Sequence, residues 1–219
     1  MRAGVITFPG SNCDRDIAVA LAACGARVER LWHGESELPA LDLIVLPGGF
    51  TYGDYLRCGA IAAHSPVMRE VVRRATAGVA VLGICNGFQI LAEAGLVPGA
   101  LISNAGLKFV CRPVALEVTS TASIFTAGYR PGQTIKLPVA HHDGCYVCTT
   151  DELERLEDED RIVLRYLDNP NGSTADIAAL LGAGRNVLGI MPHPERAADP
   201  RTGSTDGRPL LRALVETLG

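Results

Sequence analysis

The sequence lacks the features that mark membrane-spanning and nucleic-acid-binding chains. Its mainly apolar stretches are short, the segment 41–46 being an example, whereas a membrane-spanning helix needs about 20 apolar residues. The formal net charge is only −4 and the basic residues are scattered along the chain. No basic patch is therefore indicated that could attract nucleic acid or an anionic membrane, and we expect neither as a partner.

A regular cysteine pattern is also missing. The seven cysteines are an odd number without regular spacing, and residues 3–8 read as a first strand rather than as part of a signal peptide. We expect a cytoplasmic chain with reduced thiols instead of a disulfide framework. Cys145 and Cys148 form a Cys-x-x-Cys pair, so a zinc or redox site at these residues is an alternative interpretation. The pair stands alone in an expected strand, where positions three apart face opposite sides, so this alternative is disfavoured.

Short apolar strands alternate with amphipathic helices in the first half of the chain. This alternation favours a mostly parallel sheet covered on both faces, and from about residue 100 strands follow one another with few helices between. We predict an α/β fold in one domain, residues 1–219, with a single doubly wound, mostly parallel sheet that has antiparallel strands in its C-terminal half. The predicted strands are 3–8, 27–31, 41–46, 79–84, 114–119, 133–140, 146–149, 162–166, 177–181 and 187–191; the predicted helices are 14–24, 66–77, 87–94 and 206–218, and the acidic run 151–161 reads as a solvated helix or loop.

Cys85 lies at the turn between a predicted strand and a predicted helix, in the pentapeptide Gly-Ile-Cys-Asn-Gly. Small residues two places before and after such a turn lift the central side chain clear of the sheet. A sulfur at a helix N-terminus meets unpaired N–H groups and the positive end of the helix dipole, which favour the nucleophilic thiolate. We interpret Cys85 as a nucleophile; the alternative is a buried structural cysteine in a tight turn.

His193 and Glu195 follow the last predicted strand, in the segment Met-Pro-His-Pro-Glu-Arg. Two prolines should hold this segment extended, so that residues two apart face the same way. A thiol nucleophile needs an imidazole to move protons and a carboxylate to fix the imidazole tautomer. Ligands of doubly wound sheets bind beyond the carboxyl ends of the strands, where Cys85 and His193 both lie. We predict a Cys85, His193, Glu195 triad; the alternative is an exposed loop with no cysteine nearby.

A glycine-rich loop, Pro-Gly-Gly-Phe at residues 47–50, follows another predicted strand. Acyl transfer passes through an oxyanion that needs preorganised N–H donors, and glycine lets a backbone approach closely. We predict an oxyanion hole formed by backbone N–H groups of Gly49, Phe50 and Asn86, the residue after the nucleophile.

These three segments, in this order, resemble the class I, triad-type glutamine amidotransferases. Further blocks resemble the separate glutaminase subunits of phosphoribosylformylglycinamidine synthase, an enzyme of purine biosynthesis, and they span nearly the whole chain. The blocks are 8–14, 47–57 with 59–62, 83–89, 108–109 with 111–112, 168–178 and 191–196.

The resemblance implies hydrolysis of L-glutamine to glutamate and ammonia. It implies that Gln89 and the loop around Asn104 help hold the glutamine, and that no metal or organic cofactor binds this chain. It also implies two partners, a large synthetase subunit that uses ATP and magnesium and a small third subunit. The ammonia would convert formylglycinamide ribonucleotide to formylglycinamidine ribonucleotide on the synthetase.

Two segments depart from the pattern of these subunits. Residues 140–144 read Ala-His-His-Asp-Gly where Ala-His-Gly-Glu-Gly is usual, and Gly106 stands where a serine is usual. A metal site at His141, His142 and Asp143 is disfavoured, because adjacent histidines rarely present both rings to one ion. Two rival hypotheses are a cysteine peptidase on a similar sheet and a binding module that has lost its chemistry. The first gives no reason for the additional blocks, and the second predicts a missing triad residue.

Overall fold

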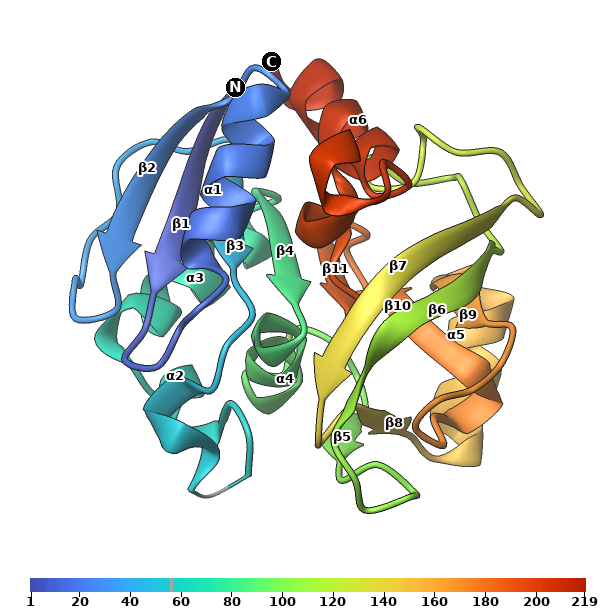
Figure 1. Cartoon of the computed structure of the whole chain (residues 1–219). Coiled ribbons are helices and arrows are strands. Elements are labelled where there is room, and N and C mark those ends of the chain that lie inside the picture. Colours follow the sequence, from blue (N-terminus) through green and yellow to red (C-terminus); the bar gives the residue numbers. More distant parts are fainter. Residues whose placement is uncertain (56) are drawn as a thin grey trace.

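The computed structural model describes residues 1–55 and 57–219; Leu56, within the block 47–57, lies outside the described residues. Its centre is a nine-stranded mixed sheet with the strand order β2-β1-β3-β4-β11-β10-β9-β6-β7 (Figure 1). The α/β fold with antiparallel strands in the C-terminal half of the chain is thus confirmed. Strands 27–31 and 162–166 were predicted within one residue of their observed bounds.

The first five strands of this order run parallel to one another. They are β2 (Arg27–Trp32), β1 (Arg2–Thr7), β3 (Leu43–Leu46), β4 (Ala80–Ile84) and β11 (Val187–Ile190). Every residue of β3 and β4 is buried, as expected for strands covered on both faces. Their carboxyl ends all point to the lower side of the molecule in Figure 1, which is where ligands of such sheets bind.

Helices cover both faces of the parallel half. α1 (Asp14–Ala23) and α6 (Arg208–Leu218) contact each other, and α3 (Pro66–Thr76) lies behind the sheet in Figure 1. α3 begins with proline at its first turn, where the missing N–H is not needed, and buries Val67, Met68, Val71 and Ala75 along one face. α4 (Asn86–Glu93) packs against β3, β4 and β11. The short α2 is Ala60–Ala63, and 3-10 turns span Thr51–Asp54, Thr174–Asp176, Pro194–Ala197 and Pro200–Thr202.

The antiparallel half consists of β10 (Ile177–Leu181), β9 (Ile162–Tyr166), β6 (Val110–Val118) and β7 (Thr134–His141). One prediction is wrong in detail, because the strand expected at 146–149 does not extend this sheet. It is β8 (Cys145–Val147), and it pairs with β5 (Ala100–Ile102) in a separate two-stranded sheet. β8 ends early because Thr149 caps α5 (Thr150–Asp158) in a capping box with Glu152, so most of the acidic run is helical.

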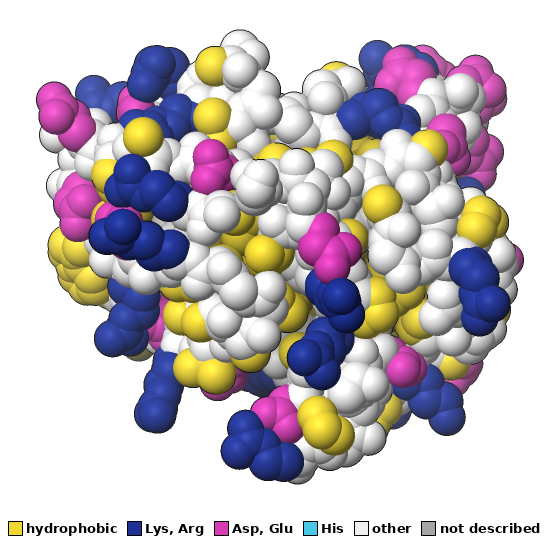
Figure 2. Space-filling model, turned by 90° about the horizontal axis from the view of Figure 1, so that it is seen from above, with side chains coloured by type: hydrophobic (Ala, Val, Ile, Leu, Met, Phe, Trp, Pro, Cys, Tyr) yellow, Lys and Arg dark blue, Asp and Glu magenta, His cyan; other side chains and the backbone are white. Residues whose placement is uncertain are grey.

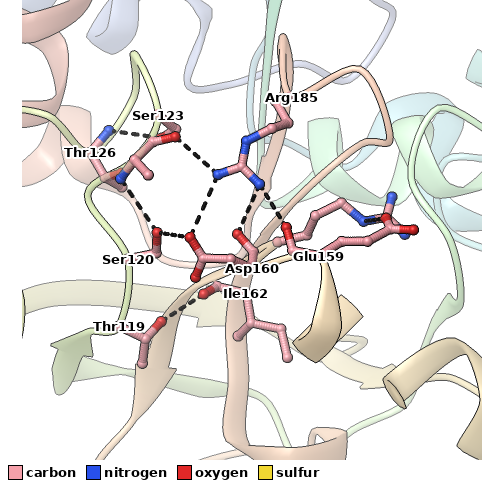
Figure 3. Close-up of polar contacts among 10 residues, drawn as sticks. Thr119, Ser120, Ser123, Thr126, Glu159, Asp160, Ile162 and Arg185 are labelled. Carbon is pink, nitrogen blue, oxygen red and sulfur yellow. Dashed lines mark hydrogen bonds and ion pairs between the residues drawn. The ribbon is translucent and has the colours of Figure 1, made fainter. Parts of the chain in front are cut away.

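The loop after β6 is held by Arg185, from the turn between β10 and β11 (Figure 3). The Arg185 guanidinium donates to the carbonyls of Glu159 and Asp160 at 2.8 and 3.0 Å and to that of Ala122 at 2.9 Å. Ser120 Oγ donates to the Asp160 carboxylate at 2.6 Å. Arg185 therefore ties the end of α5 to the loop at Ala122, which lies 63 residues before Arg185 in the sequence.

Basic and acidic side chains are both scattered over the upper face of the molecule, among uncharged and apolar surface and away from the carboxyl ends of the parallel strands (Figure 2). Among the described residues, no helix combines the length and the apolar character that crossing a bilayer requires.

Candidate active site

Three neighbouring strands deliver the predicted triad and glycine loop to one edge of the sheet. β4 lies between β3 and β11 in the sheet order, and the loop 47–50, Cys85 and His193 follow the carboxyl ends of β3, β4 and β11 respectively. The structure thus brings together segments that are more than 100 residues apart in the sequence.

Cys85 occupies a sharp turn with φ 50° and ψ −105°, immediately before α4. Two glycines make this turn possible. A Cβ at Gly87 would overlap the carbonyl oxygen of Leu46, and a Cβ at Gly83 would lie 2.6 Å from the carbonyl oxygen of Gly87. Glycine at both positions therefore lets α4 pack against β3 and β4 while Cys85 adopts a backbone conformation that costs other residues free energy.

His193 and Glu195 form a buried pair. His193 Nδ1 lies 2.6 Å from Glu195 Oε1, and neither side chain is more than 2% exposed. The backbone reaches this geometry differently from the prediction: His193 is extended, but Pro194 starts a 3-10 turn that carries Glu195. The backbone N–H of His193 donates to the Pro138 carbonyl at 2.8 Å, which anchors the imidazole to β7.

The His193 pKa lies well above its ordinary value near 6.5. Burial alone would lower this pKa, but the negative charges of Glu195 and of the Cys85 thiolate outweigh it. His193 Nε2 is buried and has no hydrogen-bond partner among the described residues. This nitrogen is thus available for proton transfer on the side of the ring opposite Glu195.

The predicted N–H donors of the oxyanion hole differ in whether they already make a hydrogen bond. The Phe50 N–H donates to the Gly10 carbonyl at 3.0 Å, so it is already occupied. The N–H groups of Gly49 and Asn86 donate to no backbone carbonyl in the described part of the chain, and Asn86 occupies the first position of α4, where N–H groups have no intrahelical partner. Gly49 and Asn86 therefore remain candidate donors, whereas the occupied N–H of Phe50 does not fit the role predicted for it.

Cys85 lines a cavity of about 210 Å³. Gln89 forms part of its wall and bridges two neighbours: its Nε2 donates to the Asp143 carbonyl at 2.6 Å, and its Oε1 accepts from Asn86 Nδ2 at 2.7 Å. The lining residues are Gly49, Phe50, Asp54, Cys58, Cys85, Gln89, Ala140, His141, His142 and Asp143.

Asn104 does not line this cavity. Its side chain is buried behind the cavity wall and bonded on both sides. Nδ2 donates to the carbonyls of Lys108 and His141 at 2.8 and 3.0 Å, and Oδ1 accepts from the Gly144 N–H at 3.0 Å. Asn104 thus holds the segment 141–144 in place, and any effect on a ligand is indirect.

Sequence reasoning missed Cys13 as a neighbour of the triad. Cys13 is buried, and Arg196 Nη2 donates to its Sγ at 2.8 Å. Donor atoms of Cys13, His193 and Glu195 lie within 4.8 Å of one another. Three such residues could in principle hold a metal ion, but two ligands of one zinc ion lie about 3.4 Å apart. The 2.6 Å separation of the imidazole and carboxylate atoms is that of a hydrogen bond, so the distances favour a hydrogen-bonded pair over a zinc site. Only the inclusion of Cys13 in the block 8–14 could have signalled its position.

Cys145 and Cys148 are both free, as are the other five cysteines. Burial raises the pKa of both thiols, which disfavours the thiolate that metal binding or redox chemistry requires. Neither thiol lines the cavity at Cys85, so the pair contributes nothing to this site.

Known proteins with similar sequences are glutamine amidotransferases or subunits of one enzyme. The family model of CobB/CobQ-like glutamine amidotransferase domains matches residues 1–207. The phosphoribosylformylglycinamidine synthase subunit PurQ of Roseobacter denitrificans is 57% identical over 219 residues, covering 100% of this chain and 99% of that protein. The subunit of the same name from Novosphingobium aromaticivorans is 58% identical over 216 residues, covering 98% and 96% of the two chains.

Solved structures show the same relationship. A chain from the structure of PurLQS from Thermotoga maritima superposes with a TM-score of 0.93 at 42% identity, covering 100% of this chain and 99% of that one. The glutaminase domain of Trypanosoma brucei CTPS, solved with bound acivicin, has a TM-score of 0.64 at 15% identity and covers 100% and 93% of the two chains, which shows a shared fold alone. The chain therefore belongs to the CobB/CobQ-like glutamine amidotransferase family and, within it, to the PurQ subunits of phosphoribosylformylglycinamidine synthase.

Proposed function

We propose that this chain is the glutaminase subunit of phosphoribosylformylglycinamidine synthase and that it hydrolyses L-glutamine through Cys85, His193 and Glu195. The observation that carries the proposal is the position of Cys85. It lies on a strained turn that lines a cavity and close enough to His193 to raise its pKa, the imidazole being paired with the Glu195 carboxylate, in a chain of the PurQ family.

The reaction begins when the Cys85 thiolate attacks the amide carbon of glutamine. The carbonyl oxygen becomes an oxyanion, which the N–H groups of Gly49 and Asn86 are placed to stabilise. Protonated His193 then gives its proton to the amide nitrogen, the C–N bond breaks, and ammonia leaves a glutamyl thioester on Cys85. Neutral His193 next takes a proton from water, which attacks the thioester and releases glutamate and the thiolate.

Glu195 keeps the proton of His193 on Nδ1 and stabilises the imidazolium that exists before each proton donation. The raised pKa of His193 supports this role, since the charges of Glu195 and Cys85 favour the protonated imidazole. A thiolate and imidazolium pair is the reactive form of cysteine nucleophiles.

The cavity has a charge pattern suited to free glutamine. The carboxyl groups of Asp54 and Asp143 belong to lining residues, and Asp54 Oδ1 is buried without a partner among the described residues. We assign these acids to the α-ammonium group of the substrate, Gln89 to the wall that confines it, and Asn104 to the support of that wall. No metal ion takes part in this proposal.

We further propose that the ammonia passes to a large synthetase subunit, which uses ATP and magnesium to make formylglycinamidine ribonucleotide, and that a small third subunit belongs to the assembly. The name PurLQS of the Thermotoga maritima structure supports such partners. Exposed apolar side chains next to the cavity support the docking of a partner there: Phe50, which lines the cavity, lies 6.4 Å from Phe109 between ring centroids, and Leu107, two residues before Phe109, is 74% exposed. In this proposal residues 1–219 form one amidotransferase domain of a cytoplasmic enzyme.

The test is ammonia release from glutamine by the purified chain, with and without the synthetase subunits. We expect weak hydrolysis by the chain alone and strong activation in the complex with bound nucleotide, because partner binding can complete the oxyanion loop. A glutamine-derived electrophile should label Cys85 among the seven cysteines. Labelling of another cysteine would refute the assigned nucleophile.

A further inference from the structure

His141 presents a second imidazole to the active-site cavity. It ends β7, lines the same cavity as Cys85, and is 3% exposed as a whole residue. The proposed chemistry uses only His193, so the reaction leaves His141 without a role.

The hydrogen bonds of Asn104 determine which nitrogen of His141 carries the proton. Asn104 Nδ2 donates to two carbonyls, those of Lys108 and His141. Its Oδ1 must therefore be the atom that accepts from Gly144 N–H and that lies 3.0 Å from His141 Nδ1. Because an amide oxygen only accepts, Nδ1 must donate, and Nε2 of the neutral ring keeps a lone pair.

No hydrogen-bond donor in the described part of the chain reaches that lone pair. His141 Nε2 is buried and lacks a hydrogen-bond partner among the described residues, and a buried polar atom without a partner costs free energy unless a ligand satisfies it. Burial and the nearby charge of His193 lower the pKa of His141 to about 4. The ring therefore remains neutral, and Nε2 remains an acceptor, at neutral pH.

We propose that His141 Nε2 accepts a hydrogen bond from the carboxamide N–H of the substrate and so selects primary amides over esters and acids. This inference rests on the proposed function. Glutamine offers two N–H donors on the nitrogen that becomes ammonia, whereas a γ-ester offers none. Holding one N–H at His141 also orients the nitrogen in the tetrahedral intermediate, so that its lone pair can face the proton of His193.

Two substitutions of His141 separate this role from a structural one. In His141→Asn the amide group replaces Nδ1, so the contact with Asn104 can persist while the acceptor at Nε2 is lost. In His141→Gln the longer side chain brings an amide oxygen to about the position of Nε2. The two variants thus separate the two functions of the imidazole. His141→Asn removes the acceptor at the cavity, and His141→Gln removes the contact of Nδ1 with Asn104.

The experiment compares kcat/KM for glutamine and for glutamate γ-methyl ester, with the chain assembled in the synthetase complex. We expect His141→Asn to lower the ratio of the two kcat/KM values by about tenfold, the effect of one unmade hydrogen bond, and His141→Gln to recover part of it. An equal fall for both substrates, or an unchanged ratio, would overturn the inference.

Ester hydrolysis by each variant is an internal control for folding, because it uses the same nucleophile and base. His141→Phe supplies a third variant that retains a ring but offers no acceptor, and it should behave like His141→Asn. Failure of the proposed function would look different. In that case the unsubstituted complex would hydrolyse neither substrate, or Cys85→Ala would retain both activities.

Discussion

Glu195 Oε1 lies 2.6 Å from Nδ1 of His193, and burial removes both groups from water. A charge-assisted hydrogen bond of this kind is stronger in a site that excludes solvent. It leaves His193 Nε2 as the one ring nitrogen that can exchange a proton with the thiol and the substrate. The pair therefore assigns different functions to its members, proton transfer to His193 and orientation to Glu195.

Substitution of each member should reveal this division. We expect His193→Ala to lower kcat for glutamine about 10⁶-fold, nearly as much as loss of the thiol, because triad members act as a unit. Glu195→Gln should lower it about 10⁴-fold, because the imidazole remains but its tautomer is no longer enforced. Steady-state ammonia release measures both values. Near-normal turnover by His193→Ala would show that another base, with His141 or His142 as first candidates, acts instead.

Stability should depend on pH through His141. Its pKa is about 4 in the folded protein and about 6.5 in an unfolded chain, so the unfolded state binds more protons between these values. The free energy of unfolding should therefore fall as the pH is lowered from 6.5 to 4, by about 3 kcal/mol in total. His193 has a raised pKa in the folded protein. Its contribution to the free energy of unfolding is therefore fully present below pH 6.5 and does not change between pH 6.5 and pH 4.

Urea unfolding at pH 7 and pH 4.5 measures this effect in the unsubstituted chain and in His141→Phe, which has no titrating group at this position. Apart from His193, whose charge is coupled to that of His141, the other groups titrate alike in the two proteins, so the difference reports the titration of His141 and this coupling. The same pH dependence in both proteins would contradict the assigned pKa.

Gly87 should tolerate no side chain. A Cβ there would overlap the Leu46 carbonyl oxygen, so Gly87→Ala must displace α4 from β3. We expect a loss of about 1–3 kcal/mol in the free energy of unfolding, together with a loss of glutaminase activity as the Asn86 N–H moves. Gly106→Ala is the matched control, since a Cβ at Gly106 meets no atom within 4 Å. Equal stability of the two variants would argue against close packing at the nucleophile turn.

Local patterns predicted the parts of the site that local geometry builds. The glycines around Cys85 lie within two residues of it, so the turn could be recognised from a pentapeptide. His193 and Glu195 were paired correctly in space by their separation, although Pro194 begins a 3-10 turn where an extended segment was expected. The parallel half of the sheet followed from the alternation of apolar strands and helices, and the antiparallel half from successive strands with few helices between them, although segment 146–149 was wrongly placed in the same sheet.

Contacts between distant segments could not be predicted in this way. The occupied Phe50 N–H depends on the Gly10 carbonyl, 40 residues earlier, and the contact of Cys13 with Arg196 joins residues 183 positions apart. The pairing of β8 with β5 removed it from the main sheet. Asn104 was expected near the ligand, but its four hydrogen-bond contacts depend on how segments 104–108 and 141–144 pack together.

The most direct test of the account is the activity of Cys85→Ala in the assembled synthetase complex. With ATP and formylglycinamide ribonucleotide, we expect this complex to make the amidine when supplied with free ammonia and to make none from glutamine. That result would separate glutamine hydrolysis at Cys85 from the synthetase reaction. Failure with ammonia as well, in a complex that assembles normally, would contradict the account, because Cys85 would then be required for the synthetase step itself.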